Sequence, residues 1–189
     1  MAQATRENMF TESQILRVPL TQARNADGTT IAGSAGSGVF GISSGGWGSG
    51  TLALVGEAAS GNTKTSTTLV ALSVPENAQE TAYDTGSKSW TISIDARVSV
   101  IAATSATLDI EAYRSDHNNG VSGSDLVTTA AQDINSATWA TKTFTLTATN
   151  IEPGDTLIVL IRTVVNDSTG ANSSVAQIGG IKATYNGKM

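Results

Sequence analysis

The sequence predicts an all-β protein, an antiparallel two-sheet sandwich of the jelly-roll type, with a long extended N-terminal arm. Two observations predict the sandwich: apolar and polar residues alternate over several short segments, and threonine fills many of the polar positions, where its branched side chain packs well on a pleated surface. A third observation predicts the arm, because residues 28–56 are rich in glycine and serine and contain no charged residue. We therefore divide the 189 residues into an arm, 1–50, and a sandwich, 51–189.

The arm is expected to lie against a surface, either that of its own domain or that of a neighbour. A Gly/Ser-rich stretch usually forms a flexible linker. Here Val39, Phe40 and Trp47 stand between the glycines, and leaving such side chains in water costs ~1.5–3 kcal/mol for each that could be buried. Residues 5–17 are expected to form a short helix that ends at Val18, because the residue before a proline avoids the helical conformation.

The rest of the chain is expected to contain seven or eight strands. Trp90 alternates in register with Ile92 and Ile94, which predicts that its ring lies in the core. Leu157–Ile161 is apolar at every position, as in a central strand covered on both faces, and a bulge is expected at Gly179-Gly180. The segments with a strand pattern are 68–74, 90–100, 108–113, 144–148, 157–161 and 175–185.

Composition excludes several classes of function. The chain has no cysteine, which excludes disulfides, cysteine metal sites and thiol catalysis, and its single histidine, His117, makes a zinc or haem site unexpected. Eleven basic residues stand against 16 acidic ones, a balance that disfavours nucleic-acid binding. No apolar run approaches the ~20 residues of a membrane helix, and the N-terminus lacks the apolar segment of a signal peptide. We therefore expect synthesis in a cytoplasm, with no membrane partner.

Three weaker patterns each have a simpler explanation. Residues 116–127 resemble a calcium loop, but Gly120 and Val127 stand at two ligand positions, so a polar hairpin loop is favoured. Trp139 precedes a strand and could stack on a sugar, as an exposed aromatic does in a carbohydrate-binding sandwich. Three carboxylates on strands could form a glycosidase pair, although a solvated outer face explains them more simply: Asp95, Asp109 and Glu111.

Several segments resemble small structural proteins of tailed bacteriophages. They include WTISIDARV at 90–98, LDIEAYRSD at 108–116 and EPGDTLIVLIRTVVNDSTGA at 152–171. Over about residues 51–185 the chain is similar to jelly-roll head-decoration, or cement, proteins and related virion components. The resemblance implies a homotrimer seated on the shell of the major capsid protein, at the capsid surface of the virion, without enzymatic activity.

We therefore expect a capsid decoration protein that stabilises the phage head through its arm and its oligomer contacts, since long arms can bind several neighbours by strand addition and symmetry multiplies each weak contact. The alternatives are a tail-fibre, head-fibre or adaptor protein of the virion, or a carbohydrate-binding β-sandwich module. Deleting residues 1–50 is expected to leave a folded sandwich that no longer attaches to capsids. No catalytic, cofactor or metal residue is assigned, and the expected partner-binding anchors are Met9, Phe10, Ile15, Leu16, Phe40 and Trp47.

Overall fold

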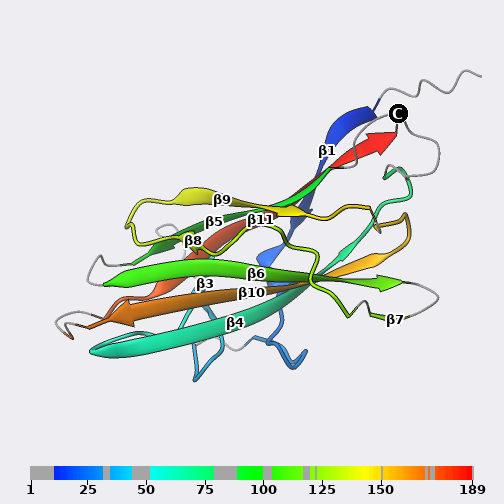
Figure 1. The fold of residues 1–189 in the computed structure, drawn as a ribbon. Coiled ribbons are helices and arrows are strands. Elements are labelled where there is room, and N and C mark those ends of the chain that lie inside the picture. The colour runs from blue at the N-terminus through cyan, green and yellow to red at the C-terminus, as the bar shows by residue number, and fades with distance from the viewer. Residues whose placement is uncertain are drawn as a thin grey trace, which may run out of the picture.

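The computed structural model forms two antiparallel sheets that pack face to face (Figure 1). It describes residues 11–31, 35–43, 52–78, 89–99, 104–116, 120–121, 123–149, 151–168, 170 and 173–188. Over these residues the chain contains strands, loops and one single-turn 3-10 helix, η1 (Leu20–Gln22). None of the described segments is a helix long and apolar enough to cross a membrane. The predicted antiparallel two-sheet sandwich is confirmed.

The first sheet, here called sheet A, is organised around the last strand, β11. One edge of β11 pairs with β5, which in turn pairs with β9. The other edge pairs first with β3 and then with β1, while β2 extends the sheet beyond β3. The bounds of these strands are Thr11–Val18 for β1, Gly41–Ser43 for β2, Ala53–Val55 for β3, Trp90–Val98 for β5, Ala140–Leu146 for β9 and Ala176–Lys188 for β11.

The second sheet, sheet B, has β10 (Thr156–Asp167) at its centre. Both edges of β10 are paired, one with β4 and one with β6, so the central position predicted for Leu157–Ile161 is confirmed. Alternate residues of this run point inward and are fully buried, whereas Ile158 and Leu160 on the outer face are half-buried. The other strands of sheet B are β4 (Asn62–Ser73), β6 (Ser105–Asp116), β7 (Gly120–Val121) and β8 (Gln132–Asp133).

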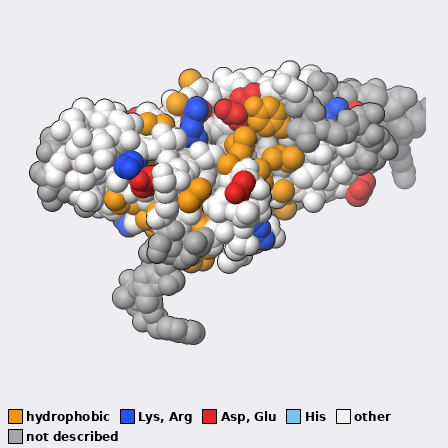
Figure 2. Space-filling view, turned by 90° about the horizontal axis from the view of Figure 1, so that it is seen from below, with side chains coloured by type: hydrophobic (Ala, Val, Ile, Leu, Met, Phe, Trp, Pro, Cys, Tyr) orange, Lys and Arg blue, Asp and Glu red, His pale blue; other side chains and the backbone are white. Residues whose placement is uncertain are grey.

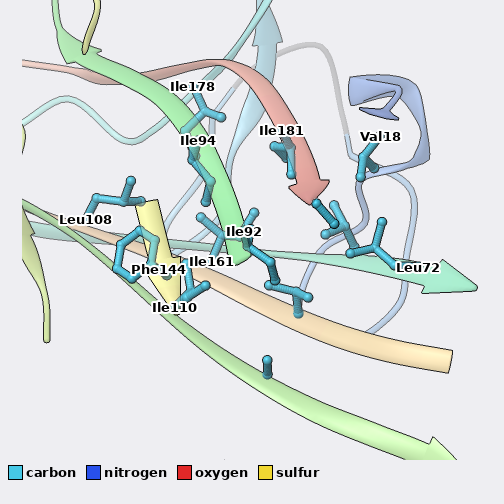
Figure 3. Close-up of a cluster of buried hydrophobic side chains, with 14 of the residues drawn as sticks. Val18, Leu72, Ile92, Ile94, Leu108, Ile110, Phe144, Ile161, Ile178 and Ile181 are labelled. Carbon is cyan, nitrogen blue, oxygen red and sulfur yellow. The ribbon is translucent and has the colours of Figure 1, made fainter. Parts of the chain in front are cut away.

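The core between the sheets is built from the inward residues of both. Figure 3 shows Ile92 and Ile94 of β5 with Phe144 of β9 near Ile110 of β6 and Ile161 of β10. Trp90 is 2% exposed and stacks on Tyr185 of β11, with ring centroids 4.9 Å apart, so its predicted place in the core is confirmed. On the face seen in Figure 2, the few charged side chains are scattered around a central group of hydrophobic side chains.

Residues 11–43 belong to this sandwich over the parts that the structure describes. After η1 the chain runs beside β4, where Arg24 and Leu69 exchange two backbone hydrogen bonds of 2.8 Å and the Thr67 amide donates to the Gly38 carbonyl at 3.0 Å. Apolar side chains of this segment enter the same core, and Val18 is seen there in Figure 3. The segment predicted as an arm thus contributes strands and core residues, namely Val18, Leu20, Ala23, Ile31 and Phe40.

The helix predicted for residues 5–17 is wrong from Thr11 onward. Thr11–Val18 is strand β1, and every one of its residues has a partner in β11, from Thr11 opposite Lys188 to Val18 opposite Ile181. The alternation of Leu16 and Val18 toward the core with Ile15 toward solvent is that of a strand with one buried face. Residues 1–10 lie outside the described part of the chain.

Candidate functional site

A groove of about 300 Å³ opens where β11 passes from β3 to β1. β3 pairs with Gln177 and Ile178, and β1 begins to pair only at Ile181, so neither covers the edge of Gly179 and Gly180. These glycines and the residues that follow form one wall of the groove, residues 17–20 at the end of β1 form another, and β5 supplies a third with Ser93 and Asp95. The gap in strand pairing therefore becomes a cavity at the outer face of sheet A.

Side chains that pack against β11 leave little room for a Cβ atom at Gly179 or at Gly180. The register between β11 and β5 shifts between Ile178 and Gly180, which confirms the predicted bulge. A Cβ atom at Gly179 would lie 2.9 Å from the benzene ring of Trp139, and one at Gly180 would lie 3.0 Å from Oδ2 of Asp95. The absence of both side chains lets an indole and a carboxylate lie against the backbone of β11.

Trp139 stands immediately before β9, and its ring reaches across β5 to Gly179 of β11. The guanidinium carbon of Arg97 lies 4.5 Å from the centroid of the indole ring, a cation–π contact. Arg97 is itself oriented by a hydrogen bond of 2.7 Å from Nε to Oε1 of Gln177. Residues of β5 and β11 thus hold the indole in place next to the start of β9, and the ring remains partly exposed beside the groove.

The polar side chains around the groove are also held in place. Asp95 accepts a hydrogen bond from the Thr141 hydroxyl, and the hydroxyls of Ser93 and Thr143 share a hydrogen bond of 2.9 Å. Across the groove, Arg17 of β1 and Lys182 of β11 both belong to its lining. One concave surface therefore combines a carboxylate, a hydroxyl and two cations, and the Trp139 ring lies beside it against Gly179. Such a surface can bind a small polar ligand through several hydrogen bonds at once.

The three predicted anchors that fall within the described residues occupy different environments. Ile15 is 57% exposed on the outward face of β1, whereas Leu16 packs partly against the core. Phe40 has no exposed surface, because its ring lies inside the core of its own sandwich, so it would have to leave that core to contact a partner. Met9, Phe10 and Trp47 lie outside the described residues. Binding of a partner by the exposed Ile15 stays a prediction.

The predicted carboxylates do not face each other across a cleft: Asp95 belongs to the other sheet, and Asp109 and Glu111 stand two residues apart on one strand. Asp95 lies on the outer face of sheet A, whereas Asp109 and Glu111 lie on β6 of sheet B. Asp109 forms an ion pair of 2.6 Å with Arg162. Glu111 accepts a hydrogen bond of 2.9 Å from the Tyr113 hydroxyl, and this bond raises the pKa of the phenol. The solvated outer face therefore accounts for these three residues.

The loop after β6 has a structural explanation in its described part. Oδ1 of Asp125 accepts hydrogen bonds from the amides of Ala112 and Val127, at 2.9 and 3.0 Å, so this carboxylate closes a turn against β6. Across the described residues, no group of three or more acidic or histidine side chains lies together as a metal site would require. His117 lies outside the described part of the chain.

Sequence reasoning identified Trp139 and the Gly179-Gly180 bulge but missed the cations of the groove. Arg17 and Lys182 come from opposite ends of the chain, and they become neighbours only through the pairing of β1 with β11. Because residues 5–17 were expected to be helical, no sequence signal placed Arg17 on a sheet. Recognising the strand alternation around Leu16 would have been the one route to it.

Neither a protein-family model nor a curated protein matches the sequence. Among solved structures, the chain is similar to the xylan-binding module CBM15, with 14% identity, a TM-score of 0.47, and coverage of 92% of this chain and 97% of that one. It is also similar to the CBM22-1 xylan-binding domain of Xyn10C from Paenibacillus barcinonensis, with 13% identity, a TM-score of 0.45, and coverage of 87% and 90%.

A third similar structure is described as a carbohydrate-binding module of the β-sandwich superfamily, with 11% identity and a TM-score of 0.45. The match covers 92% of this chain but only 56% of that one, so this chain corresponds to little more than half of its length.

Proposed function

We propose that this chain is a non-enzymatic β-sandwich module that binds a carbohydrate on the outer face of sheet A. The observation that carries the proposal is the groove lined by Ser93, Asp95 and two cations, beside which the Trp139 ring lies against Gly179. A sugar ring presents C–H groups on its faces and hydroxyls around its rim. The exposed part of an indole can receive the C–H face, while carboxylate and hydroxyl oxygens bind the rim.

The site is ordered before a ligand arrives, which favours binding. Trp139 is held between Gly179 and Arg97, and Asp95 is held by Thr141. A side chain that is already fixed loses little rotational freedom on binding, a loss that otherwise costs about 0.5–1.5 kcal/mol for each flexible side chain. The hydroxyl of Ser93 at the groove is oriented in the same way by Thr143. This pre-ordering supports recognition of a weakly polar, uncharged surface such as a sugar face.

Trp139→Ala tests the proposal. The full chain is screened on a glycan array, and the affinity for the best ligand is measured by calorimetry for the wild type, Trp139→Ala and Trp139→Phe. We expect at least a tenfold loss for the alanine variant and a smaller loss for the phenylalanine variant, because stacking on an aromatic ring contributes on the order of 1 kcal/mol or more. A blank array, or equal affinity of the wild type and Trp139→Ala, would contradict the proposal.

A second candidate is the capsid decoration protein that the sequence resemblance implies, and one observation favours it. Within the described part of the chain β1 pairs only with β11, and its outward face carries Ile15 with 57% of its surface exposed. An edge strand with a large exposed apolar residue is suited to pairing with a strand of another chain. We propose a homotrimer on the major capsid protein as the form this function would take.

Light scattering after size exclusion tests this second candidate. The expected mass is three times that of the 19.3-kDa chain, and Ile15→Asp should reduce it to the mass of a single chain. Thr145→Asp is the control, because Thr145 is an exposed residue on β9, which is separated from β1 by β11 and β5 in sheet A. A monomeric wild type that also fails to sediment with phage capsids would exclude this candidate without affecting the proposed sugar site.

A further inference from the structure

Arg17 and Lys182 occupy an unusual position for two like charges. They are direct partners in the register between β1 and β11, so their side chains leave the same face of sheet A side by side. Like charges directly opposite each other in a sheet destabilise it. Among the described residues no ion pair relieves this cost, because the pairs formed there involve neither of these two cations.

The other described arginines of this protein form ion pairs, hydrogen bonds or a ring contact with neighbouring residues of the chain. Arg114 and Arg162 form ion pairs with aspartates, Arg97 binds Gln177 and stacks on Trp139, and Arg24 donates to two backbone carbonyls. Arg17, by contrast, is directed to solvent at the mouth of a groove that it lines together with Lys182. The two cations therefore present a concentrated positive charge on a chain whose net charge is −5.

The wall of the groove formed by β5 carries the opposite charge. Asp95 lies over Gly180, one pleat away from Lys182 along β11, and it already accepts a hydrogen bond from Thr141. A carboxylate repels an anion but accepts hydrogen bonds from ligand hydroxyls. A ligand that fits this groove thus places a negative group against Arg17 and Lys182, its hydroxyl groups toward Asp95 and a C–H face toward Trp139.

We infer that the groove binds an acidic saccharide whose sugar ring carries a carboxylate, as a uronic acid does. This inference rests on the proposed carbohydrate-binding function and specifies its ligand. The guanidinium of Arg17 offers a planar pair of donors that matches a carboxylate, and the ammonium of Lys182 adds a second donor beside it. Asp95 fixes the orientation of the sugar, because the ring can bind only with its charged substituent pointing away from this residue.

The experiment compares acidic oligosaccharides with their methyl esters, which keep the same skeleton but carry no charge. Short oligomers of galacturonate, glucuronate and mannuronate are titrated into the full chain by calorimetry, each beside its ester. The proteins are the wild type, Arg17→Gln, Lys182→Gln and the control Lys142→Gln, which removes the same charge from β9 at the position opposite the inward-facing Ile94. Thermal unfolding of each variant verifies that it is folded.

We expect at least one acid to bind about tenfold or more tightly than its ester, with an affinity that falls as salt is added. Arg17→Gln and Lys182→Gln should each weaken binding of the acid about tenfold, the size expected for one charge-assisted hydrogen bond, and change binding of the ester less than twofold. Lys142→Gln should bind like the wild type.

Four outcomes would overturn the inference. If acids and esters bind equally well, or if Lys142→Gln loses as much affinity as Lys182→Gln, the charged pair does not select the ligand, while the proposed function stands. If polyglutamate binds as tightly as the acidic sugars, the pair recognises charge and not a saccharide. If no acid, no ester and no neutral glycan of the array binds, the inference and the proposed function fail together.

Discussion

Phe40→Ala tests whether the N-terminal segment is part of the folded core. The Phe40 side chain is 0% exposed and packs in the one cluster that joins both sheets. Truncating a fully buried phenylalanine removes its transfer free energy and leaves a cavity, which together cost about 3–5 kcal/mol. For a domain of this size each kcal/mol lowers the unfolding temperature by roughly 2–4 °C, so a decrease of roughly 6–20 °C is expected.

Urea denaturation followed by circular dichroism measures the effect. The midpoint should fall while the slope of the unfolding free energy stays unchanged, since the surface exposed on unfolding is nearly the same. Ile15→Ala is the control: its side chain is 57% exposed, so it should change the free energy of unfolding by no more than about 0.5 kcal/mol. Equal, small effects of both substitutions would refute the packing of Phe40 in the core.

The same reasoning changes the outcome expected for a deletion. Removing residues 1–50 takes away β1, β2 and the buried side chains of Leu20, Ala23, Ile31 and Phe40. A chain that begins at residue 51 should therefore be unfolded or aggregated, and not a stable sandwich as the sequence suggested. The deletion is consequently unsuitable for testing attachment to a partner, and point substitutions on exposed residues replace it.

Two further predictions concern the groove and the N-terminal segment. Gly179→Ala should displace the Trp139 ring, seen as a shift of its indole N–H resonance and a loss of glycan affinity, whereas Gly123→Ala, whose added Cβ meets no atom within 4 Å, should do neither. Hydrogen bonds from Lys64 and from the Gly38 amide hold the pKa of Glu57 below its usual value of 4.5. The stabilisation that these bonds give the folded state is therefore complete above pH 4.5 and is lost as the pH falls through the lowered pKa. Unfolding temperatures measured from pH 7 to pH 3 should therefore decrease less steeply for Glu57→Gln than for the wild type; parallel curves would contradict this.

The sheets could be predicted because their pattern is local. Long strands such as β5 and β10 show their inner and outer faces directly in the sequence, and Trp90 could be assigned to the core from its neighbours alone. The bulge at Gly179 was visible for a similar reason, since paired glycines inside a strand pattern weaken it and indicate a close approach of other groups. These features depend on residues only a few positions apart.

The N-terminal segment could not be placed in this way. In TESQILRV the adjacent Ile15 and Leu16 obscure the strand alternation, and the partner that makes this segment a strand lies at the far end of the chain. The uncharged stretch that contains Phe40 indicated contact with a surface, but nothing in its composition distinguished its own core from that of a neighbour. For the site, the same non-local pairing is what joins Arg17 to Lys182.

The antiparallel pairing of β1 with β11 has a mechanical consequence. Thr11 lies opposite Lys188, so both ends of the described chain leave the molecule at the same place (Figure 1). A force applied between these ends would break the backbone hydrogen bonds between β1 and β11 one pair after another, instead of loading all of them at the same time. If the protein is held by both ends, it should yield at low force, with β1 detaching first; if it is held by one end only, the two sheets carry no such load.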